Sequence, residues 1–409
     1  MKKISLLYQY LMQLQLEDDI LRQTISTLSG GEKVKIRILK LLIEEYDILF
    51  LDEPTNDLDI ETLEWLEKFI QMTSKPILYV SHDETLLSKT ANKILHLEQI
   101  KKKQECRYTL LKTTYDTYVE QRLRKLEKQT QVAKSEQREF EKKQKKLREI
   151  MQKVEYQQNT ITRADPHGGQ VLKKKMHALK SQEKKLEQTN FTEVPDVEES
   201  IHFFFDVVQI PKNKVILKLD IKELNVNHKV LSQNIYLEVI GHSHLCIIGK
   251  NGVGKTTLMR EIYQQLKDRT NIHIGYMPQE YDDILSNYEY VLDFIVENGN
   301  KEEITKARLL LGNMKFTQEE MTGKITDLSN GSKAKLFLAK MVIEACDILI
   351  LDEPTRNVSP LSNPVIRSVL KNFQGTIISV SHDRKYIKEV IEECYLFTKD
   401  GLTKIDNNF

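Results

Sequence analysis

The chain has 409 residues, which is enough for two or three domains, and its formal net charge is +1, so overall charge does not identify a partner. Its four cysteines, at positions 106, 246, 346 and 394, form no C-x-x-C pair, which suits a reducing compartment and argues against a zinc site. No apolar run approaches the roughly 20 residues that cross a bilayer. Glutamines at 9, 13 and 15 interrupt the stretch that most resembles a signal peptide. We therefore expect a cytoplasmic protein with no integral membrane segment.

The first informative pattern is Leu-Ser-Gly-Gly-Glu at residues 28–32, ahead of a predicted helix over 33–45. Ser29 and Glu32 have the spacing of a capping box, so a helix N-terminus with free N–H groups is expected there. Such groups attract anions, and the candidates for this anion site are Ser29, Gly30 and Gly31. On its own, the pattern would fit an ordinary capped helix equally well.

The next stretch predicts two parallel strands with polar ends. Residues 47–51 are mostly apolar, as in a strand covered on both faces, and they lead into Asp52 and Glu53. A helix is expected over residues 61–71, and a second strand, 77–80, ends at Ser-His-Asp. Since ligands bind at the carboxyl ends of parallel strands, these side chains are expected to lie at the edge of a site.

The same series recurs 300 residues later. The matched positions are Leu28 and Leu328, Asp52 and Asp352, Glu53 and Glu353, His82 and His382, and Asp83 and Asp383. One constant offset across five positions predicts a duplicated domain.

Residues 100–196 separate the two copies and have a different composition. Residues 101–190 hold 24 Lys or Arg and 12 Asp or Glu, a local charge of +12. Apolar residues recur every seven positions, which predicts a long helix with one narrow apolar stripe. They are Leu126, Ala133, Phe140, Leu147 and Val154. Residues 162–169 break the pattern, and Leu172, Met176, Leu179 and Leu186 then predict a return helix.

The segment is therefore predicted to be an antiparallel helical hairpin with a basic tip. The tip residues are Arg163, His167, Lys173, Lys174 and Lys175. These charges could simply solvate a hairpin surface, but a basic segment between two acidic domains favours contact with nucleic acid.

The strongest motif lies at residues 249–257, Gly-Lys-Asn-Gly-Val-Gly-Lys-Thr-Thr, between an apolar strand (245–248) and a predicted helix. This is the full G-x-x-x-x-G-K-[ST] pattern of a phosphate-binding loop, whose backbone N–H groups and lysine surround nucleotide phosphates. The candidate ATP-binding residues are Gly249, Lys250, Asn251, Gly252, Val253, Gly254, Lys255, Thr256 and Thr257.

Mg²⁺ is the expected companion of such a nucleotide. Its candidate ligands are the Thr256 hydroxyl, Gln279 at the end of a further strand, and Asp352, which could bind through water. Glu353 suits polarising an attacking water. Gln279 is placed to sense both the metal and the γ-phosphate, and we count it among the catalytic candidates.

The position 300 residues before Gly249 lies ahead of the first residue, so the first copy has no phosphate loop in this chain. We expect an N-terminally truncated form of a longer protein. Its expected parts are a partial first domain (1–99), a basic hairpin linker (100–196) and a complete second domain (197–409).

Together, these motifs resemble the nucleotide-binding domain of ATP-binding cassette proteins, and two such domains around a charged hairpin resemble the F subfamily. The resemblance implies an α/β fold of P-loop NTPase domains, one partial and one complete, with ATP hydrolysis as the activity. It also implies a site shared between the copies, in which His382 contacts the γ-phosphate and Ser29, Gly30 and Gly31 close on the nucleotide.

The implied partner is the ribosome, meaning ribosomal RNA at the tRNA exit region, with the hairpin reaching toward the peptidyl-transferase centre; no DNA partner is expected. Residues 355–360 resemble the branch that protects ribosomes against antibiotics bound at that centre.

Three departures from the family pattern weaken parts of this interpretation. The Leu-Ser-Gly-Gly-Glu segment at residues 28–32 is the signature of the family. In the second copy Asn330 stands in place of its first glycine, and Ser332 stands in place of its capping glutamate. No aromatic residue that could stack on adenine occurs over 226–229, and residues 356–359 lack the acidic groups of 56–59.

Two other functions stay open at this stage. The chain could be a degenerate fragment that binds ATP without a productive cycle, and truncation is expected to weaken hydrolysis. It could also be the energising subunit of a membrane transporter, although such a subunit has no need of the basic hairpin.

Overall fold

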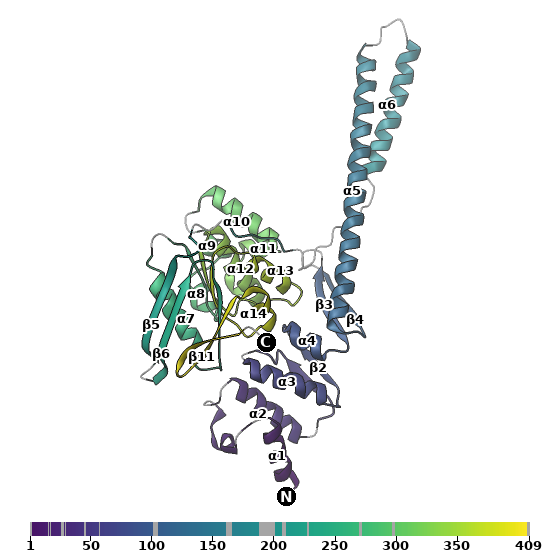
Figure 1. The fold of residues 1–409 in the computed structure, drawn as a ribbon. Coiled ribbons are helices and arrows are strands. Elements are labelled where there is room, and N and C mark those ends of the chain that lie inside the picture. Colours follow the sequence, from purple (N-terminus) through teal and green to yellow (C-terminus); the bar gives the residue numbers. More distant parts are fainter. Residues whose placement is uncertain are drawn as a thin grey trace.

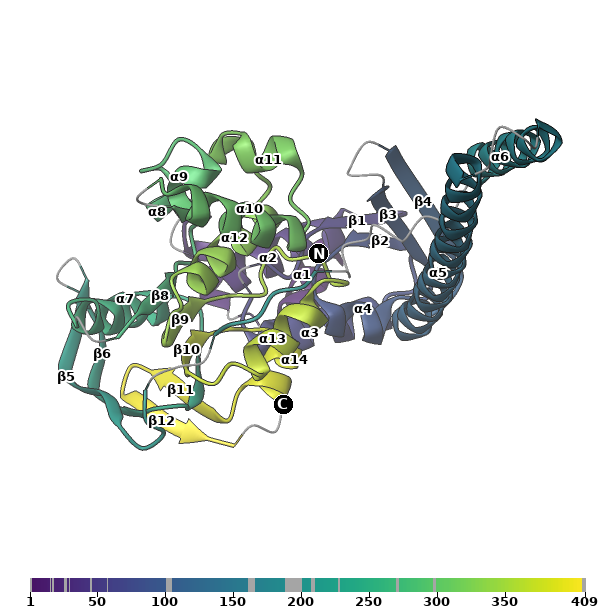
Figure 2. The same ribbon diagram turned by 90° about the horizontal axis from the view of Figure 1, so that it is seen from above.

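The structure of the chain is a computed structural model. It describes residues 2–14, 16, 18–25, 28, 30–44, 46–56, 58–100, 105–160, 166–187, 201–206, 210–226, 229–269, 272–296 and 299–406. We refer to residues 2–111 as the first unit, 115–187 as the hairpin and 201–406 as the second unit. The hairpin projects away from both units in the two views (Figures 1 and 2).

The second unit is built on a six-stranded sheet in the order β12-β11-β7-β10-β9-β8. Its central strands are parallel and every residue in them is buried, as expected for a sheet with helices on both faces. These strands are β7 (His244–Ile248), β9 (Ile348–Asp352) and β10 (Thr376–Val380). Leu349, Leu351 and Ile377 face one apolar cluster, and Ile350, Ile378 and Val380 face another that includes helix α7 (Lys255–Leu266).

The other elements of the second unit complete the sheet and cover its faces. In chain order they are β5 (Val215–Val226), β6 (Lys229–Ile240), β8 (Ile274–Met277), α8 (Asp282–Leu285), α9 (Val291–Ile295), α10 (Lys301–Asn313), α11 (Gln318–Thr322), η4 (Ile325–Asp327), α12 (Asn330–Ile343), α13 (Asn363–Lys371), α14 (Arg384–Val390), β11 (Glu393–Thr398) and β12 (Gly401–Ile405).

The first unit repeats the later part of this plan. Its elements are α1 (Lys2–Gln13), η1 (Asp18–Arg22), α2 (Gly30–Ile43), β1 (Leu49–Asp52), α3 (Ile60–Met72), β2 (Ile77–Val80), α4 (Glu84–Thr90), β3 (Ile94–Ile100) and β4 (Glu105–Leu111). The predicted strand over residues 77–80 is confirmed. Strands β1 and β2 are parallel with Leu49 opposite Ile77, and β9 and β10 pair Leu349 with Ile377. The register of the two pairs is therefore identical after a shift of 300.

The hairpin consists of α5 (Tyr115–Thr160) and α6 (Pro166–Glu187), and the prediction of two packed helices is confirmed. Leu147, Val154 and Leu179 are buried between them. The break is shorter than expected, because Pro166 begins α6 and residues 166–169 are helical; proline at the first position of a helix loses no hydrogen bond. Residues 162–165, including Arg163, lie outside the described residues.

The base of α5 is attached to strand β3 of the first unit. The hydroxyl of Tyr118 lies 2.6 Å from Nδ1 of His96, and Arg122 donates to Glu98 at 2.6 Å. In Figures 1 and 2 the start of α5 lies beside β3 and β4. The hairpin is therefore fixed at one end and free of the two units along most of its length.

Candidate nucleotide-binding site

The phosphate loop follows β7 directly, and two of its glycines are required by the backbone. A Cβ on Gly249 would lie 2.4 Å from the carbonyl oxygen of Phe397. Gly254 has φ 105° and caps α7, in a region that residues with side chains rarely adopt. The loop therefore takes the tight conformation that turns its N–H groups toward an anion at the start of a helix.

The Lys255 side chain is hydrogen-bonded to the backbone of the loop itself. Its Nζ donates to the carbonyl oxygens of Gly249 at 2.7 Å and Lys250 at 3.0 Å. Burial lowers the pKa of Lys255, although the carboxylates of Glu353 and Asp352 oppose the shift. The amine is thus held where a phosphate oxygen could replace the loop carbonyls as its partner.

The three predicted Mg²⁺ ligands lie beside the loop. Oγ1 of Thr256 donates to Oε1 of Gln279 at 3.0 Å. Asp352 is 1% exposed, and within the described part of the chain its Oδ2 has no hydrogen-bond partner. Burial raises the pKa of Asp352, against the opposing effects of Thr256 and Lys255. A buried carboxylate oxygen with no partner fits a hard cation that takes oxygen ligands.

No group of three or more His, Cys, Asp or Glu side chains among the described residues could hold a metal by itself. Such a cation would therefore depend on the hydroxyl, the amide and the phosphate oxygens of a nucleotide together with Asp352. That sharing is usual for Mg²⁺ and unlike a zinc site.

Glu353 and His382 form the second polar group at this edge of the sheet. Glu353 has φ 57°, a strained conformation for a residue with a side chain. The Ser381 hydroxyl and the His382 backbone N–H each donate to Oε2 of Glu353 at 3.3 Å, and His382 Nε2 lies 3.8 Å from Oε1. These contacts hold the carboxylate in place, and Glu353 and His382 line the same cavity as the phosphate loop.

The environment pushes the pKa values of this pair in opposite directions. Burial, with the neighbouring Asp352, raises the pKa of Glu353 to about 8. Burial, with the nearby Lys255 charge, lowers the pKa of His382 to about 3. At neutral pH His382 is therefore uncharged, and the Glu353 carboxyl is mostly protonated. A cation or an ordered water beside it would favour the ionised form.

Both units line the cavity over the loop, whose volume is about 720 Å³. Its first-unit residues are Thr55, Asn56, Leu58, Leu63, His82, Asp83 and Glu84. Its second-unit residues include Asn251, Gly252, Gly254, Lys255, Thr256, Thr257, Gln279, Asp352, Glu353 and His382. Lys250 of the loop also pairs with Glu61 of α3 at 3.5 Å.

Asp59 is a residue that sequence analysis did not assign to the site. Its carboxylate caps α3 by accepting from the Thr62 N–H at 3.0 Å. Its charge also acts on Lys255 and His382 of the second unit. The acidic residues of the 56–59 loop were the available signal, but only the packing of the two units shows what Asp59 faces.

The signature segment of the first unit is described in part. Ser29 lies outside the described residues, while Gly30 and Gly31 are the first residues of α2. Burial lowers the pKa of Lys35, one turn further along α2; Asp59, Glu61 and Glu32 oppose the shift, and the charge of Lys250 in the phosphate loop has a lesser effect in the same direction as burial. Lys35 therefore lies within electrostatic range of the loop.

Known protein families supply an independent comparison. The model of the ABC transporter family matches residues 2–56 and 232–356, one stretch in each unit. The predicted fold, P-loop cassettes joined by a helical hairpin, is thereby confirmed.

Three curated relatives show the range of similarity. The ATP-binding protein YdiF of Bacillus subtilis is 30% identical over 374 residues, which are 90% of this chain and 54% of YdiF. The ribosome protection protein VmlR of the same species is 29% identical over 92% of this chain and 70% of its own. ABC transporter F family member 5 of Arabidopsis thaliana is 26% identical over 90% of this chain and 51% of its own.

The chain thus spans little more than half the length of YdiF and of the Arabidopsis cassette protein. Among solved structures, an archaeal ribosome recycling factor, aABCE1, in complex with a ribosomal stalk protein, has a TM-score of 0.57 at 16% identity. That match covers 98% of this chain and 68% of the other, and it supports the fold alone. Within the described residues, no helix has the length and apolar character needed to cross a membrane.

Proposed function

We propose that this chain is an F-subfamily cassette protein that binds and hydrolyses ATP with Mg²⁺ between its two units and acts on the ribosome. The observation that carries the proposal is the cavity in which the phosphate loop of the second unit faces residues of the first. A nucleotide held there would contact both units, so its binding and hydrolysis would be coupled to their relative position.

In this proposal each predicted residue has one task. Residues 249–257 hold the phosphates, with Lys255 neutralising charge, and Thr256, Gln279 and Asp352 hold Mg²⁺. The metal, when bound, would shield the phosphate charge. Glu353 orients the attacking water, and uncharged His382 offers a hydrogen bond to the γ-phosphate. Ser29, Gly30 and Gly31 would close on the nucleotide from the first unit. Positioning of this kind supplies most of the catalysis in phosphoryl transfer.

The proposed partner is ribosomal RNA, reached by the hairpin in the cytoplasm. Lys173, Lys174 and Lys175 are exposed in the first half of α6, the half that lies toward the tip of the hairpin. A relative whose name is ribosome protection protein matches 92% of the chain, which favours the ribosome over a membrane transporter. The more specific proposal is binding at the tRNA exit region and protection against antibiotics at the peptidyl-transferase centre.

The test is co-sedimentation with ribosomes across a salt series. Changing Lys173, Lys174 and Lys175 to glutamine should weaken binding and reduce the slope of log K against log salt by about 2 to 3, because each phosphate contact contributes roughly 0.7 to 0.9. The matched control changes Lys142, Lys145 and Lys146, three exposed lysines on α5 further from the tip. Equal losses in the two triple variants would show that only net charge matters, and the proposed contact would then be wrong.

A further inference from the structure

The surface where the two units meet carries charges whose signs are inverted between the copies, and four of the six are buried. Glu67, Glu84 and Lys89 of the first unit correspond, with the offset of 300, to Arg367, Arg384 and Glu389. At all three positions an acid in one copy is a base in the other. These residues lie on α3 and α4 in the first unit and on α13 and α14 in the second.

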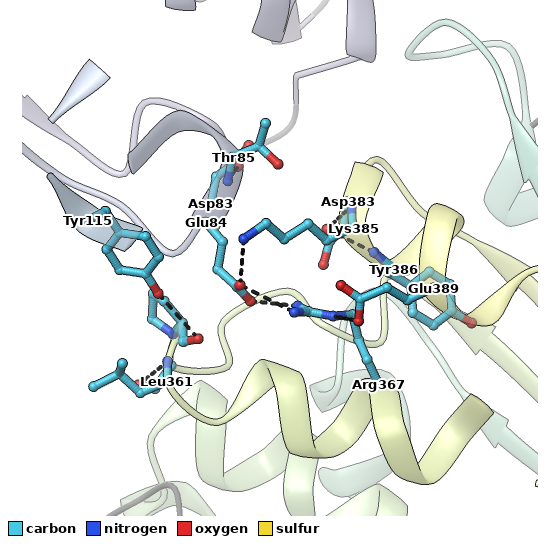
Figure 3. A network of polar contacts seen from close by, with 12 residues as sticks. Asp83, Glu84, Thr85, Tyr115, Leu361, Arg367, Asp383, Lys385, Tyr386 and Glu389 are labelled. Carbon is cyan, nitrogen blue, oxygen red and sulfur yellow. Dashed lines mark hydrogen bonds and ion pairs between the residues drawn. The ribbon is translucent and has the colours of Figure 1, made fainter. Parts of the chain in front are cut away.

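The inverted residues contact one another across the interface. Arg367 donates to both carboxylate oxygens of Glu84, at 2.5 and 3.2 Å, as Figure 3 shows. Arg384 is hydrogen-bonded to Glu67. Exchanging the two units converts the first pair into the second, so the contacts follow an approximate twofold symmetry. All four side chains are nearly buried, with exposures of 4% for Glu67, 7% for Glu84, 3% for Arg367 and 8% for Arg384.

Lys89 and Glu389 occupy the third inverted position, and each contacts an interface residue of its own unit. Lys89 binds Glu67 at 2.8 Å, and in the symmetric position Glu389 accepts from Nε of Arg367 at 2.9 Å. Glu67 and Arg367 thus each have a neighbour of opposite charge in their own unit as well as a partner across the interface. Such an arrangement keeps a buried charge paired on both sides, which a buried ion pair requires.

The residue beside this network provides an internal comparison. Asp83 and Asp383 are identical in the two copies, and both cap a helix locally: Asp83 accepts from the Thr85 and Leu86 N–H groups, and Asp383 from those of Lys385 and Tyr386. Asp83 and Asp383, which cap a helix of their own unit, thus have the same charge in the two copies. The residues that face the other unit have opposite signs.

We infer that the inverted charges specify the pairing of unlike units, so that the α3–α4 surface of a first unit accepts only the α13–α14 surface of a second unit. Two second units in the same arrangement would place Arg367 against Arg384 twice. Two first units would place Glu67 against Glu84 twice. Either pairing would bury like charges against one another, which proteins avoid strongly. Lys385, which also reaches Glu84 at 3.1 Å and has Thr85 as its counterpart, adds to the preference.

The test inverts one surface at a time in the full chain. One variant carries Glu67→Arg, Glu84→Arg and Lys89→Glu; a second carries Arg367→Glu, Arg384→Glu and Glu389→Lys; a third carries all six changes. Unit separation is measured by energy transfer between dyes on Met12→Cys and Leu309→Cys, two exposed positions, with the exposed Cys106 changed to serine.

Each half-inverted chain should lose at least tenfold in the population with paired units. The six-change chain should return to within twofold of the parent, because its charges are again complementary. When the two half-inverted chains are mixed, each supplies the surface that the other lacks. They should then form a 1:1 complex in sedimentation velocity, although each alone is a monomer.

Three results would overturn the inference: half-inverted chains that keep the parent's energy transfer, a six-change chain that stays open, or a mixture that stays monomeric. If the half-inverted chains fail to fold while the six-change chain folds, complementarity is still the property that matters, and the inference holds. If all three fail to fold, the charges serve the folding of each unit instead, and the inference is wrong.

Discussion

Strands β1 and β2 of the first unit and β9 and β10 of the second have the same register and differ in what covers them. Phe50, Leu78 and Val80 are 66%, 51% and 58% exposed, whereas the matching Ile350, Ile378 and Val380 are 0%, 0% and 1% exposed. In the second unit this face packs against α7, and β7 lies on the other side of β10. Among the described residues of the first unit, no element takes either position.

The opposite face of the first pair is covered. Leu49 is buried, and Leu51, Ile77 and Tyr79 pack against the core of the first unit. The comparison shows that pairing register follows from the residues of two strands alone. Burial depends instead on a further element that covers the two strands. In the second unit that element is helix α7, which begins in the phosphate loop.

The largest effect should come from polar substitution at one matched position in both units. Ile350→Ser should lower the free energy of unfolding of the second unit by about 3–5 kcal/mol, because it leaves a cavity and buries a hydroxyl. Phe50→Ser should change the first unit by less than about 0.5 kcal/mol, since that side chain is exposed. Hydrogen exchange of the β1–β2 and β9–β10 amides measures both. A similar loss at the two sites would mean that Phe50 is covered in solution.

The second prediction uses the fact that the phosphate-loop pattern occurs once in the sequence. Titration calorimetry should give one Mg·ATP per chain. Lys255→Ala should weaken binding roughly 10- to 100-fold, as expected when charge-assisted hydrogen bonds of about 1.5–3 kcal/mol are lost. Lys267→Ala, an exposed lysine just past the end of α7, is the control and should bind normally. Two sites per chain would show that the first unit also binds nucleotide.

The smallest effect concerns pH and compares Glu353 with Glu53. A folded-state pKa of about 8 for Glu353, raised by burial, means that the folded chain keeps a proton that the unfolded chain releases near pH 4.5. That term lowers stability as pH rises from about 4.5 to 8. The lowered pKa of His382 acts oppositely, raising stability from about pH 3 to 6.5. Above pH 6.5 the His382 term is complete, so the contribution of Glu353 is the difference between the parent and a Glu353 variant from pH 6.5 to 8.

Between pH 6.5 and 8, the Glu353 proton should make the nucleotide-free second unit lose stability at about 0.7–1.3 kcal/mol per pH unit. Glu353→Gln should flatten this slope, measured by urea unfolding at each pH. Glu53→Gln should leave the second-unit slope unchanged, because Glu53 belongs to the first unit. An unchanged slope in the Glu353 variant would mean that its carboxyl titrates normally.

Local patterns were sufficient to predict several elements. The strand at residues 77–80, the loop-to-helix transition at Gly254 and the antiparallel hairpin follow from apolar spacing, glycine position and heptad repeats, which are properties of neighbouring residues. Thr256, Gln279 and Asp352 could also be expected at one sheet edge, because the order of a P-loop fold brings the ends of its parallel strands together.

Features that depend on the packing of the two units could not be predicted. Asp59 appeared as one acidic loop residue, and nothing nearby in sequence indicates that it faces Lys255. The inversion of Glu84 and Arg384 is visible once the offset is known, but only the contact with Arg367 gives it meaning. Strand β4 falls within residues 100–196, which are predicted to be linker from their charge; its residues are mostly exposed, so no apolar pattern marks its pairing with β3.

The attachment of α5 has a mechanical consequence. Tyr115, its first residue, is buried between the units, and its hydroxyl lies 3.5 Å from the carbonyl oxygen of Pro360 in the second unit. Helix α5 is 46 residues long and so extends about 69 Å at 1.5 Å per residue. A tilt of about 5° at its base would move its far end by roughly 6 Å, by lever geometry over that length. A small tilt where α5 meets the two units would thus become a displacement the size of an amino-acid side chain at the far end of the hairpin.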